Sequence, residues 1–459
     1  MAKAPGSLKP VGNAPAPKGA PLMTHKTLFV FPAAICLTAC AHAPSPSPPP
    51  AEAPGARAPA LPAPDTRHDV KRYSKVIGWR EGQTPVAPPG FQVTRFADRL
   101  RNPRWIYVLP NKDILVAEAS SEFKSDEDKK EAQRTGKTES QNLGNSANQI
   151  TLFRDADGDG TPEVREVFLS RLHQPLGMLL LNDQFYVANT DGLWRYPYKT
   201  GQTTLQTQGE KLLDLPAGGY NNHWTRNLLA NAEGSRIYVS VGSASNIGEN
   251  GLDEEKRRAN ILEIHPDGSQ ERIYASGLRN PVGMGWAPGT QTLWTVVNER
   301  DNLGDNLVPD YLTHVQEGGF YGWPYAYFGP NEDPRLAGQQ PDLVKKTLVP
   351  DVPLGAHTAS LGLAFYDQKA FPAKYHGGAF IGQHGSWNRS ELSGYKVVFV
   401  PFQNGKPSGP PEDFLTGFIS NLEKAQVHGR PVGIAVLPDG ALLVADDASN
   451  TVWRVTHKP

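Results

Sequence analysis

Cysteine is almost absent from this sequence. Only Cys36 and Cys40 occur among the 459 residues, and both lie near the amino end. From Ala41 onward the chain can therefore form no disulfide, no cysteine-based zinc site and no haem attachment through Cys-x-x-Cys-His. A redox protein built on this chain must hold its redox group without cysteine.

An excess of positive charge is also absent. The 46 basic and 47 acidic residues give a formal net charge of −1. A protein that binds nucleic acid pairs a positive excess with the phosphates. The balanced charge thus argues against a nucleic-acid partner.

The apolar run Leu28–Leu37 is shorter than the roughly 20 residues that a membrane-spanning helix needs. Its charged start and small-residue end are typical of a secretory signal. Leu37-Thr38-Ala39-Cys40 resembles a bacterial lipobox, which predicts a leader over 1–40 and a lipid on Cys40. An ordinary signal cleaved nearby is the alternative. Residues 41–70 are rich in Ala and Pro, which predicts a disordered tether. We expect the protein on the periplasmic side of the envelope, anchored to the outer membrane by lipid alone.

Long amphipathic helices are not evident either. A helical period fits only Ser125–Arg134, within the polar stretch Glu122–Ala147, which we interpret as a surface insertion between two strands of one blade. Elsewhere a Gly/Asn/Asp/Pro turn precedes a β-branched or aromatic run, as in Asn182–Ala188 and Pro438–Ala445. About six copies recur, roughly 50–80 residues apart. The pattern predicts an all-β fold over 71–459, a six-bladed β-propeller with long loop insertions. A β-sandwich is the alternative.

One acidic loop matches the spacing of a calcium-binding EF-hand loop. The candidate ligands are Asp155, Asp157, Asp159 and Glu166, with Glu163 between the last two. The flanks 149–154 and 164–169 have the composition of strands, so we expect a hairpin in place of a helix pair. A solvated Asp/Gly turn is the other interpretation.

Several later segments are candidates for a site. His223 lies in a loop before a strand, where it could act as a general base. The polar loop 298–306 has carboxylates and carbonyls suited to a hard cation. Arg389 and Arg430 flank strands, and arginine pairs well with planar carboxylates. Each segment alone is also compatible with an ordinary turn or surface position.

Taken in order, the segments resemble the pyrroloquinoline quinone (PQQ)-dependent soluble sugar dehydrogenases, especially the sorbosone dehydrogenase branch. The resemblance covers about 91–455. It rests on five motifs, Gly-Leu-Arg-Asn-Pro-Val-Gly at 277–283, Asn-Glu-Arg-Asp with Gly-Asp at 298–305, Gly-Phe-Tyr-Gly-Trp-Pro at 319–324, His-Gly-Ser-Trp-Asn-Arg at 384–389 and Gly-Arg-Pro-Val-Gly at 429–433 with Asp446-Asp447. The resemblance implies PQQ and calcium as cofactors and a six-bladed propeller as the fold.

The resemblance also implies roles for individual residues. His223 is similar to the base that takes the hydroxyl proton while hydride passes to the quinone. The implied cofactor contacts are Gln174, Arg226, Arg389 and Arg430, and the implied calcium loop contains Arg300, Asp301 and Asp305, acting partly through carbonyls. Glucose-oxidising members carry an Arg-Asn pair over the cofactor. We assign Gly242–Ile247 to that position, and it has no arginine, so glucose is in doubt as the substrate.

The expected activity is oxidation of an aldose or sorbosone-like sugar, with electrons passed to a separate quinone or cytochrome. Two alternatives remain open at this point. One is a calcium-dependent, lactonase-like propeller hydrolase. The other is a non-catalytic propeller that binds carbohydrate or protein in the envelope. Convergence of His223, Arg389 and Arg430 on one pocket would favour the dehydrogenase.

Overall fold

The computed structural model describes residues 60–67, 70–141 and 143–458. The predicted leader, Cys40 and most of the predicted tether lie outside these residues. Within them, no helix is long and apolar enough to cross a membrane.

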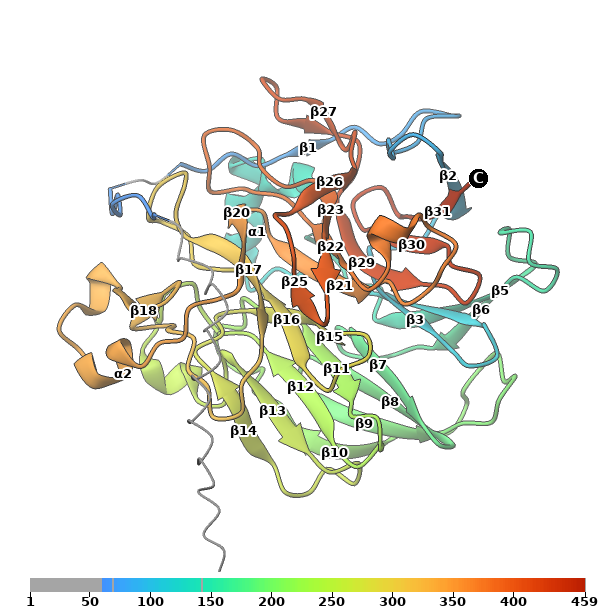
Figure 1. Ribbon diagram of the computed structural model, residues 1–459, viewed down its shortest axis with the longest axis horizontal. Coiled ribbons are helices and arrows are strands. Elements are labelled where there is room, and N and C mark those ends of the chain that lie inside the picture. Colours follow the sequence, from blue (N-terminus) through green and yellow to red (C-terminus); the bar gives the residue numbers. More distant parts are fainter. Residues whose placement is uncertain (1–59, 68–69, 142, 459) are drawn as a thin grey trace, which may run out of the picture. The chain divides into compact units, whose positions relative to one another are not determined.

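Antiparallel four-stranded sheets dominate the part of the chain that the structure describes, and there are six of them (Figure 1). In chain order, the first three consist of β3 (Pro103–Val108), β4 (Ile114–Glu118), β5 (Gln149–Arg154) and β6 (Val164–Leu169); β7 (Gly177–Leu181), β8 (Gln184–Asn189), β9 (Gly192–Pro197) and β10 (Glu210–Asp214); and β11 (Arg226–Ala230), β12 (Ile237–Val241), β13 (Asn260–Ile264) and β14 (Arg272–Ser276). The other three consist of β15 (Pro281–Trp286), β16 (Leu293–Val297), β17 (Pro309–His314) and β20 (Val352–Ala356); β21 (Ser360–Phe365), β22 (Ala379–Gln383), β23 (Lys396–Val400) and β26 (Glu412–Leu415); and β29 (Pro431–Val436), β30 (Leu442–Asp446), β31 (Thr451–His457) and β2 (Phe91–Ala97).

The sequence of each strand follows its place in the sheet. The second strands, such as β12 (Ile-Tyr-Val-Ser-Val) and β16 (Leu-Trp-Thr-Val-Val), are buried along their whole length, which is why they are almost continuously apolar. The outermost strands β10 and β14 carry exposed charged side chains, which discourage further strand pairing at an open edge. This composition and the sheet topology confirm the prediction of an all-β fold.

The first strands of the six sheets lie side by side. Each contacts the first strand of the next sheet, and β29 contacts β3, so the series closes on itself. Figure 1 shows these strands grouped together, with the later strands of each sheet further out. Glycines permit the close approach. A Cβ at Gly433 of β29 would lie 2.5 Å from the Arg104 oxygen of β3, and one at Gly177 of β7 would lie 2.8 Å from the Arg226 oxygen of β11. The first strands therefore run in one direction and begin on the same face.

The sixth sheet joins the two ends of the folded region. Strand β2 pairs antiparallel with β31, with Val93 opposite Val455. β31 in turn pairs with β30, and β30 with β29. One sheet thus combines a strand from near residue 95 with three strands from the last 30 residues.

The predicted insertion is confirmed, because it connects β4 to β5 of one sheet. It contains helix α1 (Asp126–Arg134), which begins where the period predicted a helix. Ser125 caps it by accepting a hydrogen bond from the Asp128 amide. The remaining described elements are short: β1 (Lys75–Val76), β18 (Ala326–Tyr327), β19 (Asn331–Glu332), β24 (Phe402–Gln403), β25 (Lys406–Pro407), β27 (Ile419–Asn421), β28 (Gln426–Val427), α2 (Pro341–Lys345), η1 (Lys137–Ser140), η2 (Leu252–Glu255), η3 (Pro334–Leu336) and η4 (Ala373–Tyr375).

The close packing of the first strands predicts a strong effect of one methyl group. In Gly362→Ala, the added Cβ would lie 2.0 Å from the Val432 carbonyl oxygen, so β21 and β29 must separate. We expect the free energy of unfolding to fall by about 3 kcal/mol in urea denaturation, at the upper end of what overpacking costs. The matched control is Gly144→Ala, since nothing lies within 4 Å of its added Cβ. Equal stability of the two variants would contradict the packing described.

Candidate active site

Polar residues gather where the first strands begin. At this face the first residue of each inner strand pairs with the end of the second strand, as Pro103 does with Glu118 and Pro431 with Asp446. Of the residues predicted from the sequence, Arg430 immediately precedes β29, and Gln174 and His223 lie three residues before β7 and β11. The topology thus brings to one face residues that are far apart in the chain.

His223 is buried beside the end of β12. Its Nδ1 lies 2.8 Å from the Ser243 carbonyl oxygen and 3.0 Å from Ser243 Oγ. A carbonyl oxygen only accepts, so Nδ1 carries the proton and Nε2 keeps its lone pair. Burial, and after it the charge of Arg279, lower the pKa of His223 well below its usual range. The ring is neutral at physiological pH and is able to take a proton at Nε2.

Arg226 lies behind His223 and is fully buried. Its guanidinium donates to the carbonyl oxygens of His223 at 2.7 Å, Thr225 at 2.9 Å and Pro216 at 2.7 Å. These bonds hold the loop that carries the histidine. The sequence resemblance implied a cofactor contact, whereas the described bonds of Arg226 all go to this loop, including one to the side chain of Asn221.

A second buried group joins Arg430 to His384 and Asp447, which lie in the motifs of the resemblance, and to Arg104, which the sequence analysis did not select. Arg430 donates to the carbonyl oxygens of His384 at 3.0 Å and Gly385 at 3.1 Å. Asp447 accepts from Arg104 and contacts His384. The Arg104 guanidinium also lies 5.4 Å from the Trp224 ring centre, and Trp224 is the residue after His223. The Arg430 group therefore adjoins the His223 loop.

Gln174 lies on the same face, in a loop with a positive φ of 47°. Its side-chain amide donates to the Ser120 carbonyl oxygen at 2.8 Å, and the neighbouring Ser121 Oγ accepts from the indole nitrogen of Trp224 at 2.9 Å. Residues 120–121, which follow β4, thereby link the predicted glutamine to the predicted base.

An Arg-Asn pair, Arg279 and Asn280, lies beside Gly242–Ile247, the segment in which the sequence has no arginine. A Cβ at Gly242 would lie 2.3 Å from Asn280 Oδ1 and 2.6 Å from the His223 Cβ, so Asn280 lies close to the histidine. The Asn280 Oδ1 atom is buried without a hydrogen-bond partner. Arg279 acts on the pKa of His223 through its charge. Packing across the first strands therefore brings Arg279 and Asn280 to the predicted base, beside the segment 242–247 that has no arginine of its own. The motif at 277–283 was the signal that could have located them.

The loop predicted to hold calcium is bonded mainly to protein cations. Asp301 Oδ1 lies 3.0 Å from His357 Nδ1, and Oδ2 lies 3.4 Å from an Arg279 nitrogen. The Gly304 carbonyl lies 2.9 Å from His357 Nε2. Burial acts to raise the pKa of Asp301, but the hydrogen bond from His357 and the charge of Arg279 hold it below its usual range.

Arg300 and Asp305, the other two residues of the predicted calcium loop, contact different partners from those of Asp301. Arg300 pairs with Asp333, and the Asp305 carbonyl accepts a hydrogen bond from Arg389. Arg389 therefore contacts the 303–306 loop and does not belong to the buried group that contains Arg430. The end of the predicted tether also reaches this loop, because the Asp65 amide donates to the Leu303 carbonyl at 3.0 Å and residues 62–65 border a hollow of about 320 Å³ beside Asp305.

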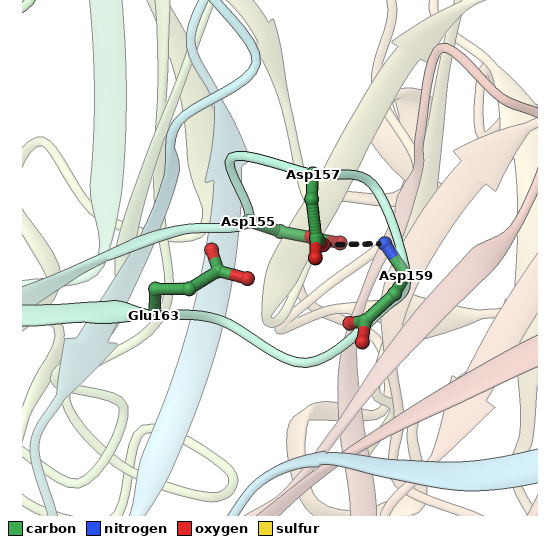
Figure 2. Close-up of side chains that lie close together, drawn as sticks. All are labelled: Asp155, Asp157, Asp159 and Glu163. Atoms are coloured by element: carbon green, nitrogen blue, oxygen red, sulfur yellow. Dashed lines mark hydrogen bonds between the residues drawn. The ribbon is translucent and has the colours of Figure 1, made fainter.

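The acidic loop at 155–163 forms the turn between β5 and β6, and the strands have the predicted bounds. One oxygen each from Asp155, Asp157, Asp159 and Glu163 lies within 4.8 Å of the others (Figure 2). Glu166, the predicted fourth ligand, is absent from this group and lies on β6 opposite Leu152. Backbone amides already bind part of this acidic group. The amides of Gly158 and Gly160 each donate a hydrogen bond to the Asp155 carboxylate at 2.8 Å.

Comparison with known proteins places these residues in a family. The TrAA12-like family model matches residues 85–316 and 342–458. An uncharacterized protein of Borreliella burgdorferi is 29% identical over 300 residues, 62% of this chain and 76% of that protein. Aldose sugar dehydrogenase YliI of Escherichia coli is 32% identical over 110 residues, 24% of this chain and 28% of that protein. The pyrroloquinoline quinone-dependent pyranose dehydrogenase of Coprinopsis cinerea is 28% identical over 228 residues, 45% of this chain and 28% of that protein.

Solved structures agree on the fold. The holo form of the PQQ domain of the Coprinopsis cinerea pyranose dehydrogenase has a TM-score of 0.65 at 22% identity, over 84% of this chain and all of that one. The calcium structure of the Trichoderma reesei carbohydrate-active enzyme of family AA12 has a TM-score of 0.65 at 18% identity, over 88% of this chain and all of that one. Together with the family model, which covers more than half of the sequence, these findings show that the chain belongs to the TrAA12-like family.

Proposed function

We propose that this protein is a PQQ-dependent sugar dehydrogenase and that its six sheets are the blades of a six-bladed propeller. The observation that carries the proposal is a buried neutral histidine surrounded by buried guanidinium groups on one face of the sheets. The names of the relatives support the same chemistry, since they include pyranose and aldose sugar dehydrogenases.

The residues on this face fit a carboxylated quinone. PQQ carries three carboxylates, which cationic side chains would bind. Arg104 Nε is buried without a partner, as is Asn280 Oδ1, so donor and acceptor capacity remains at the site. Arg104, Arg279 and Arg430 would hold the carboxylates. When bound, PQQ would supply the hydride acceptor.

The part played by His223 is that of a general base. With Nδ1–H fixed on the Ser243 carbonyl, the Nε2 lone pair would accept the proton of the sugar hydroxyl. Arg226 would hold the histidine loop in place through its three carbonyl contacts. Burial would keep water from competing for the reacting groups.

Calcium is the other cofactor that the resemblance implies, and the contacts of the loop test whether its residues fit the ion. The calcium structure of the Trichoderma reesei relative supports a metal in this fold. Here, however, His357, Arg279 and Arg389 already occupy oxygens of Asp301, Gly304 and Asp305, so these residues do not fit a calcium ion as they are arranged. No step above depends on the ion. The separate electron acceptor and the lipid anchor stay predictions from the sequence.

The proposal predicts that PQQ binds stoichiometrically and supports reduction of a dye by an aldose. We expect His223→Ala to bind PQQ but to lower kcat by ~10²–10⁴-fold, because general-base catalysis contributes about that much. Absorbance titration measures binding, with and without calcium, and dye reduction measures turnover. The control is His265→Ala, since His265 follows β13 at the opposite end of its sheet. Absence of PQQ binding at micromolar concentration would overturn the function and turn attention to lactonase and ligand-binding assays.

The lowered pKa of His223 predicts an unusual acid limb in the pH profile. A histidine with its pKa lowered stays neutral below pH 6.5 and loses its basic form only at still lower pH. We therefore expect kcat/KM to keep its plateau as pH falls through 6.5, the ordinary value. Arg279→Gln should move the limb to higher pH, because it removes a positive charge that disfavours the imidazolium. A limb at or above the ordinary value in the wild type would exclude His223 as the base.

A further inference from the structure

Asp447 occupies the centre of the buried group around Arg104 and His384. Its Oδ2 lies 2.5 Å from Arg104 Nη1, and both of its oxygens lie 2.9 Å from His384 Nε2. It follows the last residue of β30, whereas Arg104 is the second residue of β3 and His384 follows β22. One carboxylate thus joins three different sheets.

None of these groups is open to solvent. The exposed fraction is 0% for Asp447, 5% for His384 and 7% for Arg104. Burial acts to raise the pKa of Asp447, but the neighbouring His384, and after it Arg104, hold that pKa well below its usual range. Burial, and then the charge of Arg430, lower the pKa of His384 to about 3. The carboxylate is therefore ionised and the imidazole neutral at physiological pH.

These protonation states fix the direction of each hydrogen bond. An ionised carboxylate only accepts, so His384 Nε2 must carry the proton and Nδ1 the lone pair. Asp447 engages Arg104 through Nη1, and this is the hydrogen bond described for the guanidinium, because the contact of Nη1 with the protonated His384 Nε2 at 3.5 Å joins two donors. The Nε atom is buried and has no partner. The edge of the guanidinium that contains Nε thus remains for a second acceptor, and this edge suits a carboxylate bound through two hydrogen bonds.

We propose that Asp447 is a positioning residue of the cofactor site, which fixes Arg104 with its Nε edge towards a bound carboxylate and His384 in the Nε2–H tautomer. The inference rests on the proposed function for the identity of the ligand. Asp447 itself does not contact the ligand. Its effect passes through the two side chains that it holds, as an outer carboxylate orients a ligating histidine in a metal site.

The test uses the sign of the effect of Asp447→Asn on PQQ binding. Loss of a buried negative charge, taken alone, strengthens the attraction for an anionic ligand. Loss of positioning weakens it, because one of the two carboxylate oxygens becomes an NH2 donor, and either position of that group faces the Nε2–H donor of His384. We expect PQQ to bind at least tenfold more weakly to Asp447→Asn than to the wild type, measured by calorimetric titration at one pH and ionic strength. Unchanged or tighter binding would overturn the proposal.

A matched control separates this effect from general destabilisation. Asp113 is also buried and forms a bidentate pair with Arg154 at 2.7 Å, but it precedes β4 at the opposite end of the sheet from Glu118. Asp113→Asn removes a comparable ion pair and should leave the PQQ dissociation constant within twofold of the wild type. Equal weakening in the two variants would show that loss of stability, and not positioning, is responsible.

A second measurement requires neither the variant nor the cofactor. Nitrogen NMR of the cofactor-free, histidine-labelled wild type should show His384 as the Nε2–H tautomer at neutral pH. An Nδ1–H ring or an imidazolium would overturn the proposal even if Asp447→Asn fails to fold. If the wild type binds no PQQ, the proposed function fails, whereas the tautomer still decides whether Asp447 fixes His384.

Discussion

The close approach of the six first strands is the constraint on which the rest of the structure depends. At Gly362 and Gly433 the neighbouring backbone occupies the space that a side chain would need. Because these strands also run in one direction, their preceding loops meet on one face. His223, Asn280, Arg430 and Arg104 come from four sheets and more than 300 residues of sequence, yet they lie in one connected set of contacts. The site is therefore a product of backbone packing before it is a product of side-chain chemistry.

The charge at the site depends on whether each buried guanidinium contacts a neutral carbonyl oxygen or a charged carboxylate oxygen. Arg226 and Arg430 donate mainly to backbone carbonyls, and Arg279 donates to the carbonyls of Asn246, Asn298 and Glu299. Carbonyl dipoles satisfy the hydrogen-bonding groups without cancelling the full positive charge. The charges of Arg279 and Arg226 lower the basicity of His223. Among the buried carboxylates of the same face, Asp301 and Asp447 fix particular side chains.

Local sequence patterns were sufficient where the information is local. The hairpin around Asp155 appeared with its predicted strand limits, because alternating apolar residues and an Asp/Gly turn determine it within 20 residues. The helix at Ser125 was predictable from its cap and period for the same reason. Ordered motifs and the resemblance they carry selected His223 and Arg430.

What the sequence could not reveal are partnerships across sheets. Arg104 and Asp447 are 343 positions apart, and nothing in either local segment indicates that they meet. For the same reason the sequence could not place Asn280 beside Gly242, since the two become neighbours only through packing of β11 against β15. The resemblance implied that Arg226 contacts the cofactor. Only its bonds in the structure show that it holds the loop of His223.

The pairing of β2 with β31 has a consequence for how the molecule forms. The sheet that contains both strands cannot be completed until the chain near residue 455 has been made, although β2 has been present since residue 97. Contacts this distant in sequence pay a large loop-closure entropy before they stabilise anything, so their formation is slow. The closed series of sheets can therefore form only after nearly the whole chain has been made, so completion of this sheet is a late step of folding.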